Sequence, residues 1–182
     1  MKKIKLSLLI IFGMMNVATA QEVKKEISDT ANHKLFCLYI NSPLGMVNRI
    51  RGEFEFRFNQ KNSILLSFSR YYGFTPGIQS YLEYRRYFFK GITTTQFFYG
   101  RAGAGQTFVK GGTYALFGAG FGQQIDLGKS KAFTIQFSEG IKVCPVISGD
   151  VEADAGSGFR GLFYLTGPGA VLALNVNLGW RF

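Results

Sequence analysis

The chain has 182 residues, of which 47% are hydrophobic, 16% aromatic and 18% charged, and its formal net charge is +10. A sequence so apolar and so poor in charge is not disordered, and its length suits a single domain. The 23 glycines, together with apolar residues that lean to Phe, Tyr, Val and Ile, favour strands over long helices, while two cysteines and one histidine exclude most metal and thiol chemistries by count.

Residues 1–20 have the pattern of a cleavable secretory signal peptide. Three lysines precede an apolar stretch, 6–15, which is too short to span a bilayer, and the Ala-Thr-Ala at 18–20 supplies the small residues that signal peptidase needs. We therefore expect the mature chain to begin with a polar periplasmic N-terminal tail, 21–34. An uncleaved N-terminal anchor is the alternative.

From residue 35 to residue 182 the sequence alternates with a period of two, which predicts one all-β domain. Across 171–182 one face carries large apolar side chains and the other small or polar ones; across 51–58 one face carries phenylalanines and the other four charges. Most such segments have nine residues or more, the length that crosses a bilayer as a tilted strand. The segments are 35–41, 50–58, 63–72, 79–89, 94–107, 114–126, 132–143 and 169–182.

The connections between these eight segments alternate in length. The short ones are 59–62, 90–93 and 127–131, and the longer ones are 42–49, 73–78, 108–113 and 144–168. Short periplasmic turns and longer extracellular loops are typical of outer-membrane proteins. The sequence thus predicts an all-β fold, an eight-stranded antiparallel transmembrane β-barrel over 35–182, located in the cell outer membrane.

The leader, the eight segments and the C-terminal run at 177–182 (NLGWRF) together resemble small outer-membrane β-barrels. The layout is similar to OmpX and to the transmembrane domain of OmpA. In detail, 34–45, 52–69 and 174–182 look closer to a family of small uncharacterised outer-membrane barrels from anaerobic gut bacteria. The resemblance implies that Leu178, Trp180 and Phe182 form the stripe that the barrel-assembly machinery reads. It implies no catalytic residue.

The charges on the predicted inner face indicate a packed lumen. An eight-stranded barrel is only wide enough for side chains to fill it, and buried charges need partners. We expect a lumen network, with an ion path as the alternative, formed by Arg51, Glu53, Glu55, Arg57, Glu83, Arg85, Lys142 and Arg181. Glycines 118, 120 and 122 are expected on the same face, where they would leave room for large charged side chains from across the barrel.

Three charges fall on the predicted lipid face: Arg70, Arg86 and Glu139. A cation near the bilayer midplane costs about 2–4 kcal/mol, and less near the interface. Arg70 and Arg86 lie near strand ends, so both are expected to snorkel. For Glu139 we expect a β-bulge at 138–140 that turns it inward, with a protein partner against this face as the alternative.

Other candidate sites are sparse. Asp150, Glu152 and Asp154 faintly resemble a calcium loop, but Gly161 stands where an EF-hand requires glutamate, so a solvated acidic loop is the main interpretation. We expect no metal and no cofactor. Cys37 and Cys144 are expected to be separate thiols, with a disulfide as the alternative.

These features favour a non-enzymatic outer-membrane protein with a structural or interaction role. Its expected partners are outer-membrane lipid and lipopolysaccharide, the barrel-assembly machinery and another membrane protein, but not nucleic acid. One alternative is a lipid-modifying enzyme, which would need a histidine near the outer leaflet; the chain's one histidine, His33, is in the tail. The other is a secreted barrel that holds a small ligand, which would need an apolar interior.

Overall fold

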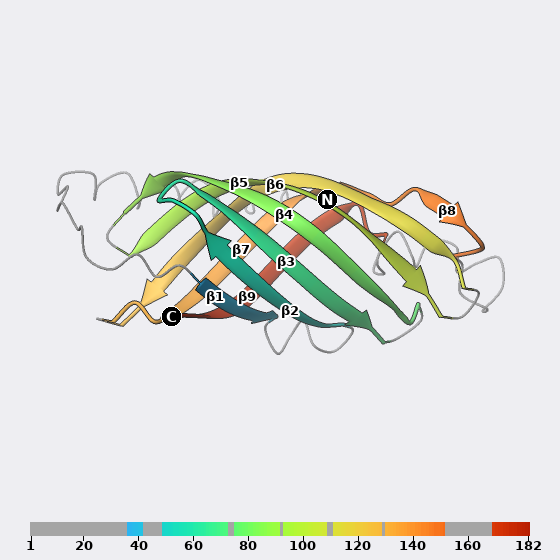
Figure 1. Ribbon diagram of the computed structural model, residues 1–182, viewed down its shortest axis with the longest axis horizontal. Helices are drawn as coiled ribbons and strands as arrows, with labels where there is room; N and C mark the ends of the chain where they lie inside the picture. Colours follow the sequence, from blue (N-terminus) through green and yellow to red (C-terminus); the bar gives the residue numbers. More distant parts are fainter. Residues whose placement is uncertain are drawn as a thin grey trace, which may run out of the picture.

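In the computed structural model, the described residues are 36–41, 49–72, 75–91, 93–108, 111–128, 130–151 and 169–182. They form nine strands (Figure 1), namely β1 Phe36–Asn41, β2 Arg49–Arg57, β3 Asn62–Tyr71, β4 Gly77–Lys90, β5 Thr94–Thr107, β6 Thr113–Leu127, β7 Phe133–Val143, β8 Val146–Ser148 and β9 Leu172–Arg181. Within these ranges no helix is long and apolar enough to cross a membrane. The predicted signal peptide and tail, 1–34, lie outside the described residues.

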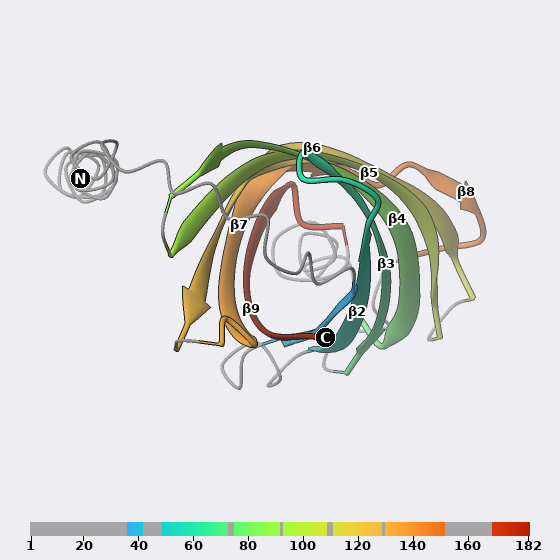
Figure 2. The same cartoon turned by 60° about the vertical axis from the view of Figure 1, so that its left-hand side comes forward.

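Eight of the strands close into an antiparallel ring. Each strand from β1 to β6 pairs with the next one, and β9 pairs with β7 on one side and β1 on the other. Leu38 of β1 lies opposite Trp180 of β9 at this closure, which Figure 2 shows as the meeting of the first and last strands. The predicted eight-stranded antiparallel barrel is confirmed.

The strand outside the ring, β8, was not expected. It follows β7 after two residues and pairs with the start of β6, where Ser148 lies opposite Thr113 and Val146 opposite Tyr114. Residues 144–168 are therefore not one loop, because the segment begins by extending the sheet beyond the ring. Three residues are too few for a period of two to stand out in the sequence.

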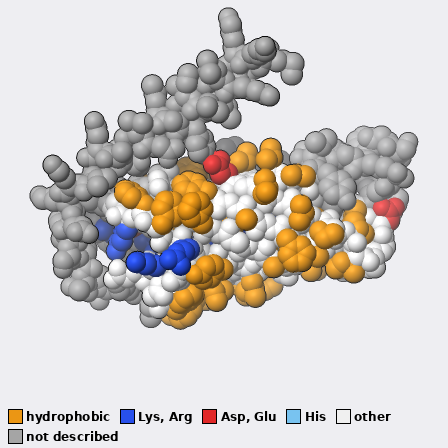
Figure 3. Space-filling model, turned by 90° about the horizontal axis from the view of Figure 1, so that it is seen from above, with side chains coloured by type: hydrophobic (Ala, Val, Ile, Leu, Met, Phe, Trp, Pro, Cys, Tyr) orange, Lys and Arg blue, Asp and Glu red, His pale blue; other side chains and the backbone are white. Residues whose placement is uncertain are grey.

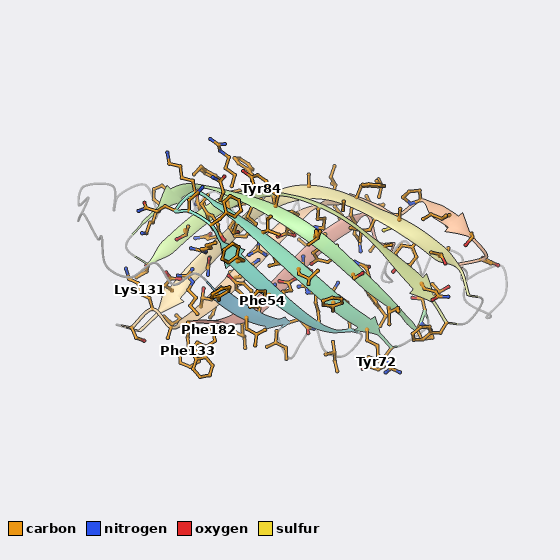
Figure 4. All side chains as sticks on the ribbon, viewed as in Figure 1. Phe54, Tyr72, Tyr84, Lys131, Phe133 and Phe182 are labelled. Carbon is orange, nitrogen blue, oxygen red and sulfur yellow. The ribbon has the colours of Figure 1, made fainter. Side chains whose placement is uncertain are left out.

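The two ends of the barrel differ in their connections. We call turn end the one with the short connections 58–61, 91–93 and 128–132, and loop end the opposite one. Figure 4 shows Lys131, Phe133 and Phe182 at the turn end and Tyr72 at the loop end. At the turn end Gly128 has φ +72°, a conformation that glycine adopts without steric cost. The connections at the loop end are longer on average, as predicted, although 128–132 at the turn end is as long as 72–76 and 108–112.

Alternate residues of each strand face opposite sides of the wall, as the sequence pattern predicts. In β3, Ile64, Leu66 and Phe68 are exposed on the outside, whereas Leu65 and Ser67 between them are buried. Large apolar side chains are exposed on every strand of the ring. The side of the molecule seen in Figure 3 carries many apolar side chains, with Lys and Arg gathered near one end. The inside is filled by tyrosines, amides and charges, so the polar core lies within the ring.

Candidate functional site

The most organised group of polar side chains in the described part of the chain is an ion-paired cluster in the lumen. Four arginines face three glutamates there, and six of these seven side chains are buried, while Arg57 is partly exposed. We call this group the lumen cluster, and its members are Arg51, Glu53, Glu55, Arg57, Glu83, Arg85 and Arg101.

Glu55 of β2 lies at the centre of the cluster and is fully buried. Its Oε2 accepts a hydrogen bond of 2.7 Å from the hydroxyl of Tyr39 and lies 3.3 Å from Nη1 of Arg85. Its Oε1 accepts from Nε of Arg57 at 3.2 Å and from the hydroxyl of Tyr87. Both carboxylate oxygens are thus engaged by groups from three strands, β1, β2 and β4.

Glu53 and Arg51 form the next layer toward the loop end. Oε1 of Glu53 lies 3.1 Å from Nε of Arg51, and its Oε2 accepts from the amide of Asn177 at 2.9 Å. The two terminal nitrogens of Arg51 donate to Oδ1 of Asn175 at 2.7 Å and Oδ1 of Asn177 at 2.6 Å. The amides of β9 therefore satisfy a buried guanidinium that the single carboxylate cannot satisfy alone.

Glu83 links two arginines from neighbouring strands. Its Oε1 accepts from Nε of Arg85 at 2.7 Å, and its Oε2 lies 3.3 Å from Nε of Arg101. The guanidinium of Arg101 also lies over the ring of Tyr99, 4.3 Å from its centroid. The sequence analysis missed Arg101, although this residue lies two positions after Tyr99 and four after Phe97, which puts it on the inner face.

The predicted lumen residues separate into two groups. Six of the eight belong to the lumen cluster, whereas Arg181 lies near the turn end and donates from Nη1 to Oδ2 of Asp126 at 2.8 Å. Asp126 is a second participant that the sequence analysis missed. Lys142 is buried on the inner face of β7, opposite Gly118, toward the loop end. All eight lie on the inner face of the barrel wall.

The inner glycines of β6 make room for a neighbouring strand, not for charges from across the barrel. Phe97, Tyr99 and Arg101 of β5 lie directly opposite Gly122, Gly120 and Gly118. A Cβ at Gly122 would collide with the ring of Phe97, and one at Gly118 would lie 3.3 Å from Cγ of Arg101. The expectation about what these glycines accommodate was wrong, because pairing of adjacent strands decides which side chain lies over each glycine.

The predicted inward turn of Glu139 was also wrong. The pairing of β7 with β6 and β9 runs without a bulge through this residue, which lies opposite Phe121 and Leu174. Glu139 therefore faces outward among apolar side chains. Arg86 and Arg70 are exposed on the same face near the turn end and the loop end respectively, which are positions from which their side chains can snorkel.

The C-terminal stripe lies on the outer face at the turn end. Leu178, Trp180 and Phe182 are 43%, 58% and 62% exposed. The indole of Trp180 stacks on Phe133 with centroids 5.5 Å apart, and Phe36 stacks on Phe182 at 6.2 Å. The amide of Phe182 donates to the carbonyl of Phe36 at 3.1 Å, so the last residue completes the ring closure.

The remaining candidate residues, for a metal site and for a disulfide, do not come together. Asp150 is described, whereas Glu152 and Asp154 lie outside the described residues, and within the described ranges no three metal-ligating side chains gather. Cys37 and Cys144 are both buried and are not joined by a disulfide.

Comparison with known proteins adds one structural likeness. No family model matches the chain, and the search of curated proteins returned no match. Among solved structures, the chain is similar to the N-terminal β-barrel domain of Pseudomonas aeruginosa OprF, with 12% identity and a TM-score of 0.48, over 81% of this chain and 95% of that one. The strand pairing described above establishes the barrel independently of this likeness.

Proposed function

We propose that this chain is a non-enzymatic outer-membrane β-barrel protein with a structural or interaction role. It crosses the membrane of a Gram-negative cell with the eight strands of the ring, holds its turn end in the periplasm and presents its loops outside. The lumen cluster closes the barrel to solutes and stiffens the wall.

The observation that supports membrane insertion is that apolar side chains face the outside of the barrel while charged ones on the same strands face the inside. Phe54 and Phe56 are exposed on the outside of β2, while Glu53 and Glu55 on the same strand are buried. A barrel in water would reverse this order, since its wet surface would be polar and its interior apolar. An apolar exterior with an aromatic girdle near one end is the arrangement that lipid requires.

The lumen cluster favours a plugged barrel over a channel. Both oxygens of Glu53, Glu55 and Glu83 are engaged by arginines, tyrosines or amides. Opening a water path would break several of these contacts at once. The same pairing argues against catalysis in the lumen, because a general acid or base needs a group able to exchange its proton with substrate.

The alternatives have less support. An enzyme that modifies lipid at the outer leaflet needs a base near the loop end, whereas His33 precedes β1, a strand that begins at the turn end. A ligand-holding barrel needs an apolar cavity, and charges occupy the interior here. The partners that this proposal implies are outer-membrane lipid, lipopolysaccharide and the barrel-assembly machinery.

Cell fractionation and bilayer recordings test the proposal together. The mature protein should fractionate with the outer membrane and migrate faster on gels when it is not boiled. Reconstituted into planar bilayers, it should give no large, steady conductance. Recovery as a soluble periplasmic protein would refute the membrane placement, and a stable open channel would refute the plugged lumen.

A further inference from the structure

The outer face of the barrel carries a groove of about 650 Å³ near the loop end. Two adjacent rows of paired residues line it. The row nearer the loop end runs from Ile50 through Arg70 and Ile78 to Gln106, and the next row runs from Gly52 through Phe68 and Ser80 to Ala104.

The groove exists because three of the four residues in the second row are small. Phe68, which is 60% exposed, stands between Gly52 and Ser80 and forms a wall, while Ile78 closes the side toward the loop end. No atom lies within 4 Å of the position that a Cβ on Gly52 would take, and the φ of this residue is not positive. Neither packing nor backbone conformation therefore requires glycine here, although glycine weakens a strand.

A cation marks the loop end of the same groove. Arg70 is exposed, and its guanidinium carbon lies 5.4 Å from the ring centroid of Tyr72. Within the described ranges no carboxylate forms a salt bridge with it. Its charge on the outer face is thus available to an anion that approaches from the surroundings of the barrel.

We propose that this groove binds one acyl chain of a phosphorylated lipid of the outer leaflet, and that Arg70 holds the phosphate of that lipid. The inference rests on the membrane placement proposed above, which sets the loop end at the outer leaflet. Arg70 is the penultimate residue of β3 and so lies at the level where headgroups begin, while the small second row lies one step deeper, among acyl chains. A guanidinium binds phosphate by charge-assisted hydrogen bonds, and an open apolar trough suits a flexible chain.

A second copy of the chain fits this groove less well. In a two-fold dimer the same patch faces itself, so Arg70 would meet Arg70 and one hollow would meet another. Like charges in such a contact repel, and two facing hollows leave a void. A lipid supplies both the anion and the chain that fills the space.

The experiment is a titration of the full chain, purified in detergent, with lipid A and with the same lipid stripped of its phosphates, followed by native mass spectrometry. Arg70→Gln removes the cation, and Arg86→Gln is its matched control, an exposed arginine of the same face at the turn end. Gly52→Leu puts a side chain into the groove at a position where a Cβ meets no atom within 4 Å. Gly100→Leu is its control, because Gly100 also faces outward with nothing within 4 Å of a Cβ but does not line the groove.

The wild-type protein should bind the phosphorylated form about tenfold more tightly than the stripped form, as a charge-assisted contact predicts. Arg70→Gln should lose this preference and Gly52→Leu should weaken binding of both forms, while each control behaves as wild type. Faster migration of unboiled samples identifies folded variants, and Gly52→Leu gives an independent test if Arg70→Gln is not recovered.

Three results would overturn the inference. The first is an unchanged preference of Arg70→Gln for phosphorylated lipid A, and the second is unchanged lipid binding by Gly52→Leu. The third is that Gly52→Leu loses dimers and not bound lipid, which would assign the groove to self-association. Each of these, in a protein that fractionates with the outer membrane, leaves the proposed function intact. A soluble protein would refute both.

Discussion

The inner and outer faces of the barrel wall consist of alternate residues of the same strands, yet side chains on the inner face contact several neighbouring strands and positions on the outer face can be left open. On the inner face of β2, Glu55 is fixed by groups from three strands. On the outer face of the same strand, Gly52 has open space where a side chain would be. The inner face is therefore specified by long-range contacts, whereas the outer face is specified mainly by its apolar character, which the proposed membrane placement would require.

Removal of a central charge should have the largest effect. Glu55→Ala removes the carboxylate that pairs with Arg57 and one of those that pair with Arg85, so we expect the free energy of unfolding in lipid vesicles to fall by about 3–5 kcal/mol. Glu55→Gln should lose less, because its amide oxygen can still accept from Tyr39. Urea titration of both variants measures this, and an unchanged midpoint for Glu55→Ala would mean that the lumen cluster adds no stability.

Arg181 and Phe182 are neighbours in the chain but lie on opposite faces of the wall, so their variants test the two faces separately. Deletion of Phe182 should lower the amount of assembled barrel and raise periplasmic degradation, and Phe182→Ala should do so more mildly. Arg181→Ala should still be delivered, but it should lose about 1–3 kcal/mol of stability because Asp126 keeps a buried charge with one partner fewer.

Heat-modifiable protein in membranes, at matched expression, compares these three variants. Assembly of all three at the wild-type level would show that the terminal stripe carries no assembly information. If Arg181→Ala assembled worst, delivery would depend on the inner face of β9.

Two glycine substitutions test how tightly each face is packed. Gly122→Ala places a methyl group against the ring of Phe97 and should cost about 1–3 kcal/mol. Gly100→Ala meets nothing on the outer face and should be neutral or slightly stabilising. Thermal loss of the heat-modifiable form measures both, and equal effects would contradict the difference in packing.

The outward carboxylate should give the smallest change, with the opposite sign. Glu139→Leu removes a charge from the lipid face and should raise the free energy of unfolding in vesicles by about 1 kcal/mol. The free energy of unfolding of Glu139→Gln should lie between those of the wild-type protein and Glu139→Leu. Destabilisation by Glu139→Leu would instead indicate that a partner binds this carboxylate.

The sequence was sufficient to predict the faces but not the contacts on them. A period of two assigns every residue of a strand to one side, so the lumen position of Glu53 and the outward position of Trp180 could be predicted. Which residues meet depends on the stagger between strands, and nothing local in the sequence records it. For that reason the partners of Gly118 and Gly122 were wrongly predicted.

The other differences between prediction and structure also concern contacts or pairing between strands. Arg101 stands in a run of glycine and alanine, where the inner-facing period is hard to see, and Asp126 acquires its role only from its contact with Arg181. The bulge expected at Glu139 rested on the cost of a charge in lipid, but the pairing of β7 with both neighbours continues unbroken through this residue. The outer groove was not predicted, because it arises from residues of several strands that register brings together.

The chain's one tryptophan offers the most direct test that the apolar face meets lipid. Trp180 is 58% exposed on the outside of β9, near the turn end. In vesicles made with brominated lipids, its fluorescence should be strongly quenched, and most strongly when the bromines lie close to the headgroup. Fluorescence that brominated lipids leave unchanged, with efficient quenching by aqueous iodide, would contradict an outer face in contact with the membrane.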